Sequence, residues 1–306
     1  MAHKGEGIAV TGGLGFIGSN LLRALPSDAH IDVIDNLNTG SKSNLEGIVG
    51  RDRIRIFEED ARMIERHEDV RYSTIYHLGF YSASPMYRKD PHHVADVIDG
   101  MISVLEKARK DDSNVVFSST SSIYNGVTPP HREDATPDVT DYYTEGRIAC
   151  ERLSDLYHKM YGLNISAMRF FSVYGKYEAA KDGYANLATQ FLWAMKKNEP
   201  PVIYGDGTQR RDFIYVEDVV EALKKASTYK GYDAFNVGTG KNYSLNELVD
   251  MLNTMLHKGI KARYVEMPVK NYVHETLADT SKAERKIGFR ARISLEEGLN
   301  IINRFY

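Results

Sequence analysis

The stretch Thr11-Gly12-Gly13-Leu14-Gly15-Phe16-Ile17-Gly18 decides how this chain folds. The apolar run Ile8-Ala9-Val10 precedes it, and residues 19–25 follow it with the apolar spacing of a helix. A glycine-rich turn between a strand and a helix exposes backbone N–H groups at the positive end of the helix dipole, where a pyrophosphate binds. The stretch therefore predicts a strand, a phosphate-binding turn and a helix in immediate succession.

Three glycines have separate tasks in such a turn. Gly12 allows the tight turn, Gly15 lets the backbone approach the phosphates, and Gly18 lets helix and strand pack closely. Asp35 closes the next predicted strand. A carboxylate there accepts hydrogen bonds from both adenosine ribose hydroxyls and repels a 2′-phosphate, which favours NAD over NADP. A solvated aspartate at a strand end is the structural alternative.

Short β-rich runs alternate with helical patterns over the first half of the chain. We expect strands at 7–10, 30–34, 54–57, 74–77 and 114–118, and helices at 15–25, 61–69, 94–110 and 141–161. The later part mixes helices at 185–197, 216–227, 245–257 and 295–305 with strands at 163–169, 202–204, 213–215, 234–237 and 261–265. The alternation predicts an α/β fold, with a Rossmann-type doubly wound parallel sheet and a smaller mixed α/β substrate-binding lobe.

Composition narrows the class of protein. The chain has 306 residues, of which 42% are hydrophobic, enough for one two-lobed enzyme or two domains. A formal net charge of -3 gives no indication of nucleic acid or an anionic membrane as a partner. No apolar run approaches the roughly 20 residues that span a bilayer, and the N-terminus lacks a signal-peptide pattern. The single cysteine, Cys150, fits a cytoplasmic location, and no metal site is expected.

A tyrosine and an arginine form a candidate catalytic pair. Tyr143 and Arg147 lie four residues apart on the predicted helix 141–161 and therefore share one helix face. A nearby cation favours a phenolate, which makes a tyrosine usable as a base. The run Ser118-Ser119-Thr120-Ser121-Ser122 supplies hydroxyl groups at the carboxyl end of a strand, where parallel sheets bind ligands. Taken alone, such a Tyr/Arg pair is usually a surface pair.

Motifs along the whole chain are similar to those of the extended short-chain dehydrogenase/reductases that act on nucleotide sugars. The branch that it resembles most is UDP-galactose (UDP-glucose) 4-epimerase, within the nucleotide-sugar epimerase/dehydratase group. The similar stretches, in the expected order, are 11–18, 34–40, 76–78, 118–124, 147–151, 169–175, 204–218, 235–238 and 278–279. The block from Gly205 to Asp218 is particularly specific to nucleotide-sugar enzymes.

The resemblance implies a reaction and roles for three residues. Tyr143 would take a proton from the sugar 4-hydroxyl while a hydride passes to tightly bound NAD, and Thr120 would hydrogen-bond the same oxygen and shuttle its proton. The 4-keto sugar would rotate and take the hydride back on its other face. Arg147 stands where the family has a lysine. The expected activity is thus that of an NAD-dependent UDP-sugar 4-epimerase of the UDP-glucose/UDP-galactose type.

The resemblance also implies two sets of binding residues. The cofactor set is Gly12, Gly15, Phe16, Ile17, Asp35, Asn36, Asn38, Thr39, Gly40, Asp60, Ala61, Leu78, Ser118, Tyr143, Arg147 and Phe170. The substrate set is Ser82, Thr120, Phe171, Ser172, Asn186, Tyr204 and Arg211. Arg211 would clamp the diphosphate with charge-assisted bonds, and Tyr204 would pack on the uracil unless it is a core aromatic residue. Asp60 is almost as well explained as a helix N-cap.

The same resemblance implies how the chain is divided and assembled. Residues 1–168 would form the NAD-binding domain, with 212–238 returning to it. Residues 169–211 and 239–306 would form the nucleotide-sugar lobe. A homodimer would form through two helices of each subunit, one of them the helix that carries Tyr143, although the apolar residues of that helix could equally face the chain's own core.

Four departures from the family pattern cluster in its functional motifs. Arg147 replaces the lysine of Tyr-x-x-x-Lys; it keeps the charge, but its planar fork is bulkier than an ammonium group. Val97 falls where a cofactor-side Asn is usual, and Ser172 replaces the Asn of the Arg-x-Phe-Asn motif. The segment Val269-Lys270-Asn271-Tyr272 occupies the usual Arg-Pro-Gly-Asp/Glu region, so a nucleotide-ribose clamp is missing or rebuilt.

The residues after Thr120 separate branches of the family. The 4,6-dehydratases carry Thr-Asp-Glu there, and the sugar-nucleotide decarboxylases tend to carry Thr-Ser-Glu. This chain has Thr120-Ser121-Ser122, without a carboxylate, which disfavours dehydration. Epimerisation or simple reduction remains. One alternative is an NAD(H)-dependent ketosugar reductase of the same family. The other, which the altered motifs indicate, is a catalytically impaired dinucleotide-binding protein.

Overall fold

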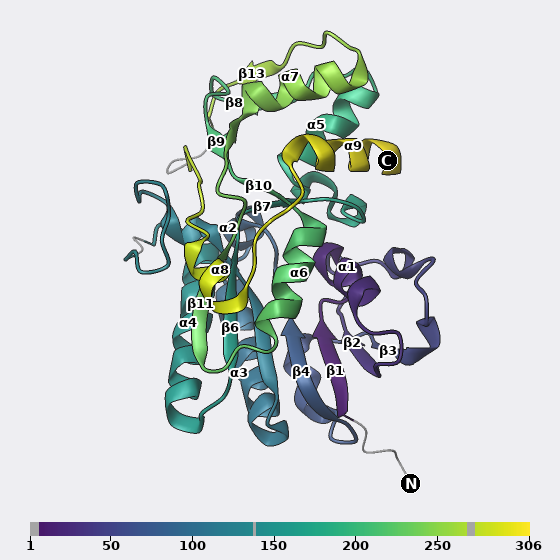
Figure 1. The fold of residues 1–306 in the computed structure, drawn as a ribbon, viewed down its shortest axis with the longest axis vertical. Helices are drawn as coiled ribbons and strands as arrows, with labels where there is room; N and C mark the ends of the chain where they lie inside the picture. The colour runs from purple at the N-terminus through teal and green to yellow at the C-terminus, as the bar shows by residue number, and fades with distance from the viewer. Residues whose placement is uncertain (1–5, 137–138, 268–272) are drawn as a thin grey trace.

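The computed structural model of the chain describes residues 6–136, 139–267 and 273–306. Its centre is a seven-stranded parallel sheet in the order β11-β6-β5-β4-β1-β2-β3 (Figure 1). The strands are β1 (Glu6–Thr11), β2 (Ile31–Ile34), β3 (Ile54–Phe57), β4 (Arg71–His77), β5 (Asn114–Thr120), β6 (Ile165–Phe170) and β11 (Tyr232–Val237). This order confirms the predicted doubly wound α/β fold, and it places the switch point between β1 and β4, where such sheets bind ligands.

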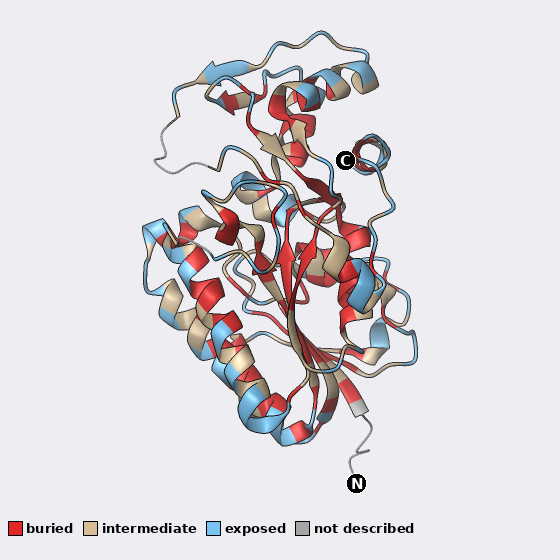
Figure 2. Ribbon diagram, turned by 60° about the vertical axis from the view of Figure 1, so that its left-hand side comes forward, coloured by how far each residue is buried: buried red, intermediate tan, exposed pale blue. Residues whose placement is uncertain are grey.

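Helices cover both faces of the sheet. α1 (Phe16–Ala24) and α6 (Val216–Ala226) pack on one face, while α3 (His93–Asp111) and α4 (Tyr142–Tyr161) pack on the other. Neighbouring residues of one strand enter different cores, as Val115 and Val116 do, because side chains alternate along a strand. The strands are therefore buried through most of their length, as the red sheet in Figure 2 shows.

A second lobe stands beyond the carboxyl ends of the strands. Its helices are α5 (Leu187–Lys196), α7 (Leu245–Leu256) and α9 (Leu295–Phe305), which enclose a core of their own. Its strands form three small pairs: β7 (Ser172–Tyr174) with β10 (Phe213–Tyr215), β8 (Val202–Tyr204) with β13 (Arg263–Val265), and β9 (Arg210–Arg211) with β12 (Tyr243–Ser244). This is the smaller mixed α/β lobe expected from the sequence.

Several short elements differ from the sequence prediction. The helix expected at 61–69 is a 3-10 turn, η3 (Ala61–Arg66), and α2 (Ser84–Lys89) and α8 (Ser281–Ile287) were not expected. The remaining 3-10 turns are η1 (Lys42–Leu45), η2 (Arg51–Arg53), η4 (Ser121–Tyr124) and η5 (Ala179–Tyr184). Because α8 packs on β11, the chain returns to the large sheet twice after entering the second lobe. The predicted domain boundaries stay a prediction.

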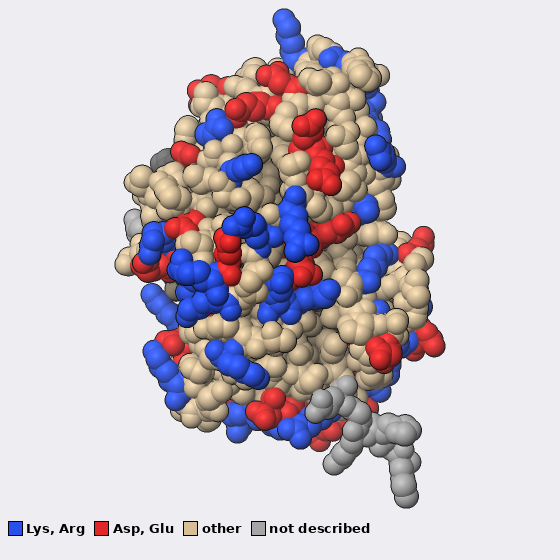
Figure 3. Space-filling model, in the orientation of Figure 1, with Lys and Arg blue, Asp and Glu red and all other residues tan. Residues whose placement is uncertain are grey.

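Charged side chains gather on one face of the molecule. Figure 3 shows lysine and arginine across its middle, over α6 and α8, with acidic side chains among them. Lys282 and Lys286 of α8 both pair with Asp233 of β11, and Lys225 of α6 pairs with Glu221 at 3.7 Å. Much of this positive charge is thus compensated within the chain. None of the described helices is long and apolar enough to cross a membrane.

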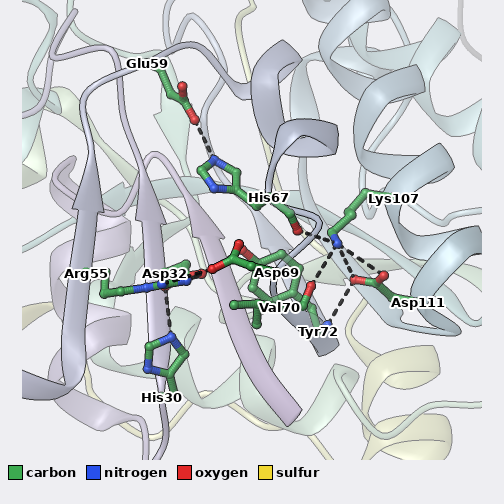
Figure 4. Close-up of polar contacts among 10 residues, drawn as sticks. All are labelled: His30, Asp32, Arg55, Glu59, His67, Asp69, Val70, Tyr72, Lys107 and Asp111. Carbon is green, nitrogen blue, oxygen red and sulfur yellow. Dashed lines mark hydrogen bonds and ion pairs between the residues drawn. The ribbon is translucent and has the colours of Figure 1, made fainter. Parts of the chain in front are cut away.

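A buried polar network joins the strands far from the carboxyl end of the sheet (Figure 4). Asp32 of β2 accepts two hydrogen bonds from Arg55 of β3, at 2.8 and 2.7 Å, and a third from the Tyr72 hydroxyl of β4 at 2.7 Å. Burial alone would raise the pKa of Asp32, but the hydrogen bonds from Arg55 and Tyr72 lower it below its usual value. The carboxylate therefore cross-links three strands in its ionised form.

A second part of this network fixes α3 to the sheet. The buried Lys107 ammonium donates to the carbonyl oxygens of His67 at 2.7 Å and Val70 at 2.9 Å. It also pairs with Asp111 one helical turn further on, at 3.0 Å. The Asp111 carboxylate in turn accepts the Tyr72 N–H at 3.0 Å. Each charge is met by an opposite charge or a carbonyl, as a buried ammonium group requires.

We predict that Asp32→Asn lowers the free energy of unfolding at neutral pH by about 2 kcal/mol, because charge-assisted hydrogen bonds are lost. The folded-state pKa lies below the unfolded value of about 3.9, so this stabilisation is complete above about pH 5 and disappears as the pH falls through the folded-state pKa. Urea unfolding of both proteins at neutral and acidic pH measures the difference. Asp28→Asn, at an exposed carboxylate before β2, is the control. An unchanged difference at acidic pH would contradict the prediction.

Candidate functional site

A cleft of about 510 Å³ opens at the carboxyl ends of the strands and is bordered by both lobes. Every residue of the predicted cofactor set lines it. Every residue of the predicted substrate set lines it too, except Tyr204. The volume is in the range of small-molecule sites. The structure therefore brings together residues from position 12 to position 211.

The glycine turn sits at the floor of the cleft with its backbone packed tightly. Gly12 has φ of 68°, and a Cβ placed there would lie 2.7 Å from the backbone nitrogen of Gly79. A Cβ on Gly18 would lie 2.2 Å from the Gly12 carbonyl oxygen. α1 begins at Phe16 after Gly15, which offers no side chain to cap the first N–H groups. Those N–H groups point toward the space where an anion can bind.

Asp35 stands at the end of β2 beside the same turn. Its two carboxylate oxygens accept the N–H groups of Leu14 and Leu37, both at 2.8 Å. The carboxylate also accepts a backbone hydrogen bond from Gly15 and keeps acceptor capacity for a ligand hydroxyl. Burial raises the pKa of Asp35 despite the backbone hydrogen bonds from Leu37, Leu14 and Gly15. Asp60 both lines the cleft and caps η3 by accepting the Arg62 N–H at 3.0 Å. Asp60 is thus a helix N-cap, and its contact with the cofactor stays a prediction.

The candidate catalytic residues come from β5 and α4. Thr120 ends β5 and is almost fully buried; its hydroxyl oxygen accepts the Ser122 N–H at 3.1 Å, a bond that does not use the hydroxyl proton. Tyr143 is the second residue of α4 and is half-buried. Its ring packs edge-on against Tyr87, with centroids 5.4 Å apart. Both hydroxyl-bearing side chains border one cleft, as the sequence predicts.

Arg147 is enclosed by aromatic rings instead of pointing outward. Its guanidinium carbon lies 4.1 Å from the ring centroid of Phe80 and 5.0 Å from that of Tyr143. It donates to the Tyr81 carbonyl at 3.0 Å and to the Tyr87 hydroxyl at 3.2 Å. Burial alone would lower the pKa of Arg147, but its interactions with Tyr87 and Tyr143 raise it, so the cation is retained. We call Phe80, Tyr81, Tyr87 and Arg147 the arginine clamp.

A neutral histidine lies beneath the arginine clamp. His77, at the end of β4, shares a hydrogen bond of 2.6 Å between its Nδ1 and the Thr11 hydroxyl. Its ring packs on Phe80, with centroids 4.1 Å apart. Burial, reinforced by the Arg147 charge, lowers the pKa of His77 to about 3. A second cation is therefore avoided next to the first at neutral pH.

The second lobe presents polar side chains to the opposite wall. Asn186 caps α5 by accepting the Ala188 N–H at 3.0 Å, and its side-chain amide donates to the Ser172 hydroxyl at 3.2 Å. Ser172, which replaces the family Asn, is thus bonded to another cleft residue. The Arg211 guanidinium donates to the carbonyls of Val273 at 2.6 Å and His274 at 3.1 Å. Arg211 therefore fixes the segment at 273–274 while lining the cleft.

Tyr204 is the predicted site residue that lies apart. It ends β8, and 44% of it is exposed to solvent. It is consequently not a core aromatic residue, and its predicted contact with uracil stays a prediction. Val269-Lys270-Asn271-Tyr272, predicted to replace a nucleotide-ribose clamp, lies outside the described residues. Val97 is buried on α3 and lines the cleft, and a Cβ on Gly146 of α4 would contact it.

Comparison with known proteins decides the family. A sequence model described as the NAD dependent epimerase/dehydratase family matches residues 8–238. The chain belongs to this family. UDP-glucuronate 4-epimerase of Thermodesulfobacterium geofontis is 31% identical over 305 residues, covering 95% of this chain and 93% of the relative. The relatives of this chain also include UDP-glucuronic acid decarboxylases of Arabidopsis thaliana.

Solved structures agree with this family. UDP-N-acetylglucosamine 4-epimerase of Methanobrevibacter ruminantium, in complex with UDP-N-acetylmuramic acid, is 28% identical with a TM-score of 0.90, covering 99% of this chain and all of the other. UDP-glucose 4-epimerase of Thermotoga maritima, with UDP-glucose, is 29% identical with a TM-score of 0.90, and 98% of each chain is covered. These likenesses confirm the predicted resemblance to nucleotide-sugar enzymes.

NAD, the cofactor of this family, fits the residues that are present. The glycine turn leaves room for close approach of a diphosphate, α1 offers uncapped N–H groups, and Asp35 offers lone pairs for ribose hydroxyls. The sequence prediction missed Phe80 and Tyr87, which enclose Arg147. Their pairing with Arg147 spans about 60 positions, as in the Tyr87 bond, and no local pattern indicates it.

We predict that Gly18→Ala weakens NAD binding at least about ten-fold, because a Cβ 2.2 Å from the Gly12 carbonyl forces the turn apart. Calorimetric titration with NAD measures the effect. Gly259→Ala is the matched control, since a Cβ there meets nothing within 4 Å. Equal affinity of Gly18→Ala and the wild-type chain would show that the turn does not bind the cofactor.

Proposed function

We propose that this family member is an NAD-dependent UDP-sugar 4-epimerase of the UDP-glucose/UDP-galactose type. The observation that carries the proposal is the shared cleft: Thr120 and Tyr143 border the same space as the dinucleotide turn and Arg211. A sugar nucleotide lying between the lobes would place its sugar between the cofactor and these two hydroxyl groups. UDP-sugar epimerases among the relatives support the same class of substrate.

The proposed chemistry is transient oxidation at sugar C4. NAD, held at the glycine turn and beside Asp35, would supply reversible hydride acceptance at C4. Tyr143 is the base that receives the proton of the 4-hydroxyl. Thr120, hydrogen-bonded to the same oxygen, relays it by taking up the sugar proton while giving its own hydroxyl proton to Tyr143. The 4-keto sugar then turns its other face, so the hydride returns without stereospecificity. The stretch Thr120-Ser121-Ser122 offers no carboxylate for the additional proton transfers of dehydration.

The arginine clamp supplies the charge that the proposed base requires. A cation near Tyr143 stabilises the phenolate, and the Arg147 guanidinium lies 5.0 Å from the ring centroid. Its fork is occupied by Tyr81 and Tyr87, so the role of a lysine in binding the nicotinamide ribose is not reproduced by the same contacts. Arg147 therefore acts on Tyr143 chiefly as a fixed charge.

The decisive experiment is direct. The purified chain is incubated with UDP-glucose, UDP-galactose and their N-acetyl forms, and NMR of the anomeric protons measures interconversion. The epimerase proposal expects one pair to equilibrate without net consumption of NADH. Net consumption of added NADH with a keto sugar would instead support a reductase. Binding of NAD without turnover of any substrate would support a dinucleotide-binding protein, and the proposal would be wrong.

We predict that Arg147→Lys lowers kcat by about ten-fold or more with a smaller change in KM, because an ammonium cannot reach both Tyr81 and Tyr87 while packing on Phe80. Steady-state kinetics of epimerisation measures the effect. Arg152→Lys, at an exposed position of the same helix, is the control. A gain in kcat would mean that the arginine hinders a site suited to lysine.

We also propose a homodimer that forms through α3 and α4. These helices pack side by side and leave large apolar side chains exposed, among them Ile102, Leu156 and Met160. Ile148 of α4, in contrast, is buried in the chain's own core. Light scattering at micromolar concentration tests the mass, and a monomer would contradict the proposal.

A further inference from the structure

The segment from Lys176 to Tyr184, here called the strap, crosses from β7 to α5 above α1 (Figure 1). Asn20 of α1 donates to the Lys176 carbonyl at 3.0 Å, and the Arg23 guanidinium carbon lies 3.8 Å from the Tyr177 ring centroid. Tyr306 accepts the Glu178 N–H at 2.8 Å. The strap is therefore fixed at its base to α1 and to the end of α9.

The upper part of the strap faces the cofactor half of the cleft. Residues 180–184 line a hollow opposite Asn38 and Thr39, which follow β2. Lys181 and Tyr184 also line the main cleft. Asp182 has φ of 45° and ψ of -124°, a conformation that non-glycine residues avoid unless the surrounding structure imposes it. The strap therefore lines both the main cleft and the hollow beside it.

Lys181 brings a cation to the beginning of α1. Its Nζ lies 5.4 Å from the ring centroid of Phe16, the first residue of that helix. It also lies 3.2 Å from a Glu178 oxygen. Glu178 accepts two further hydrogen bonds, from the Asn186 N–H and the Thr189 hydroxyl, both at 2.7 Å. The carboxylate therefore keeps two partners when the lysine turns to an anion.

Among the described residues that line the cleft, the other lysine and arginine side chains do not approach the beginning of α1 as Lys181 does. Arg147 is enclosed in the arginine clamp, and Arg211 donates to backbone carbonyls of the second lobe. Arg88 lies on α2, where it donates to Ser84 at 3.2 Å. Lys181 is the one that contacts both the first residue of α1 and the hollow opposite Thr39. A diphosphate at the glycine turn carries negative charge that the N–H groups alone do not balance.

We propose that Lys181 binds the diphosphate of NAD and that the strap retains the cofactor in the cleft. The second lobe then contributes directly to a site that the fold otherwise builds from the first. The proposal concerns cofactor binding, so it stands or fails independently of the reaction proposed above. Glu178 positions the lysine in the absence of the anion.

Calorimetric titration of nucleotide-free protein tests the proposal with NAD, ADP, adenosine and UDP. We expect Lys181→Met to weaken binding of NAD and ADP by about ten-fold, because a charge-assisted bond to phosphate is lost, and to leave adenosine affinity within about two-fold. Lys181→Arg should keep most of the affinity. Lys197→Met, at an exposed lysine at the end of α5 and outside the strap, is the control and should match the wild type.

Three outcomes would overturn the proposal. NAD and ADP could bind Lys181→Met as tightly as the wild type. Adenosine affinity could fall as much as ADP affinity, which would indicate a damaged strap instead of a lost phosphate contact. UDP binding could weaken while NAD binding is unchanged, which would assign the lysine to the sugar nucleotide. Thermal unfolding of each variant confirms that it is folded, and the titrations require no turnover.

Discussion

The close approach of backbones at the β1–α1 turn is the constraint on which the site depends. Gly12 lies against the backbone of Gly79 after β4, and Gly18 lies against Gly12 itself. Side chains at these points would separate α1 from the sheet. Because the turn stays compact, the N-terminus of α1, Asp35 and the end of β4 converge on one small volume. The cofactor half of the cleft is built almost entirely from this convergence.

The surroundings of Arg147 are suited to an arginine at the position where the family pattern has a lysine. A guanidinium is larger than an ammonium and has more donors, so it needs a planar surface and fixed acceptors. Phe80 supplies the surface, and Tyr81 and Tyr87 supply the acceptors. The neutral His77 beneath them avoids repulsion. The substitution at Arg147 is therefore accompanied by a matching environment, which is the physical reason for treating it as part of the site.

The sequence was sufficient for the features that arise from local patterns. The glycine turn, the sheet strands and most long helices follow from periodicity and turn chemistry, and the family motifs placed nearly all predicted residues on one cleft. Short elements were predicted less well, because a few residues carry little periodic signal: α2 was not predicted, and η3 was predicted as a longer helix. The surroundings of Arg147 and the position of Lys181 were not predicted for another reason. Both depend on segments far apart in the chain that only the folded structure brings together. Tyr204 is a different case: it belongs to a stretch that closely resembles a family motif, and yet it is not among the residues that line the cleft.

The anchoring of the strap has a consequence for the order in which the molecule is made. The Tyr306 hydroxyl contacts Glu178 and also donates to the Gly175 carbonyl at 3.1 Å, so the base of the strap depends on the last turn of α9. A nascent chain can form the glycine turn early, because it needs only the first strands and α1. The contacts of Tyr306 with the base of the strap cannot form until α9 has been synthesised and has left the ribosome. Firm capture of the cofactor would then require folded α9, and a chain in which α9 has not yet folded would exchange NAD freely with the surrounding solution.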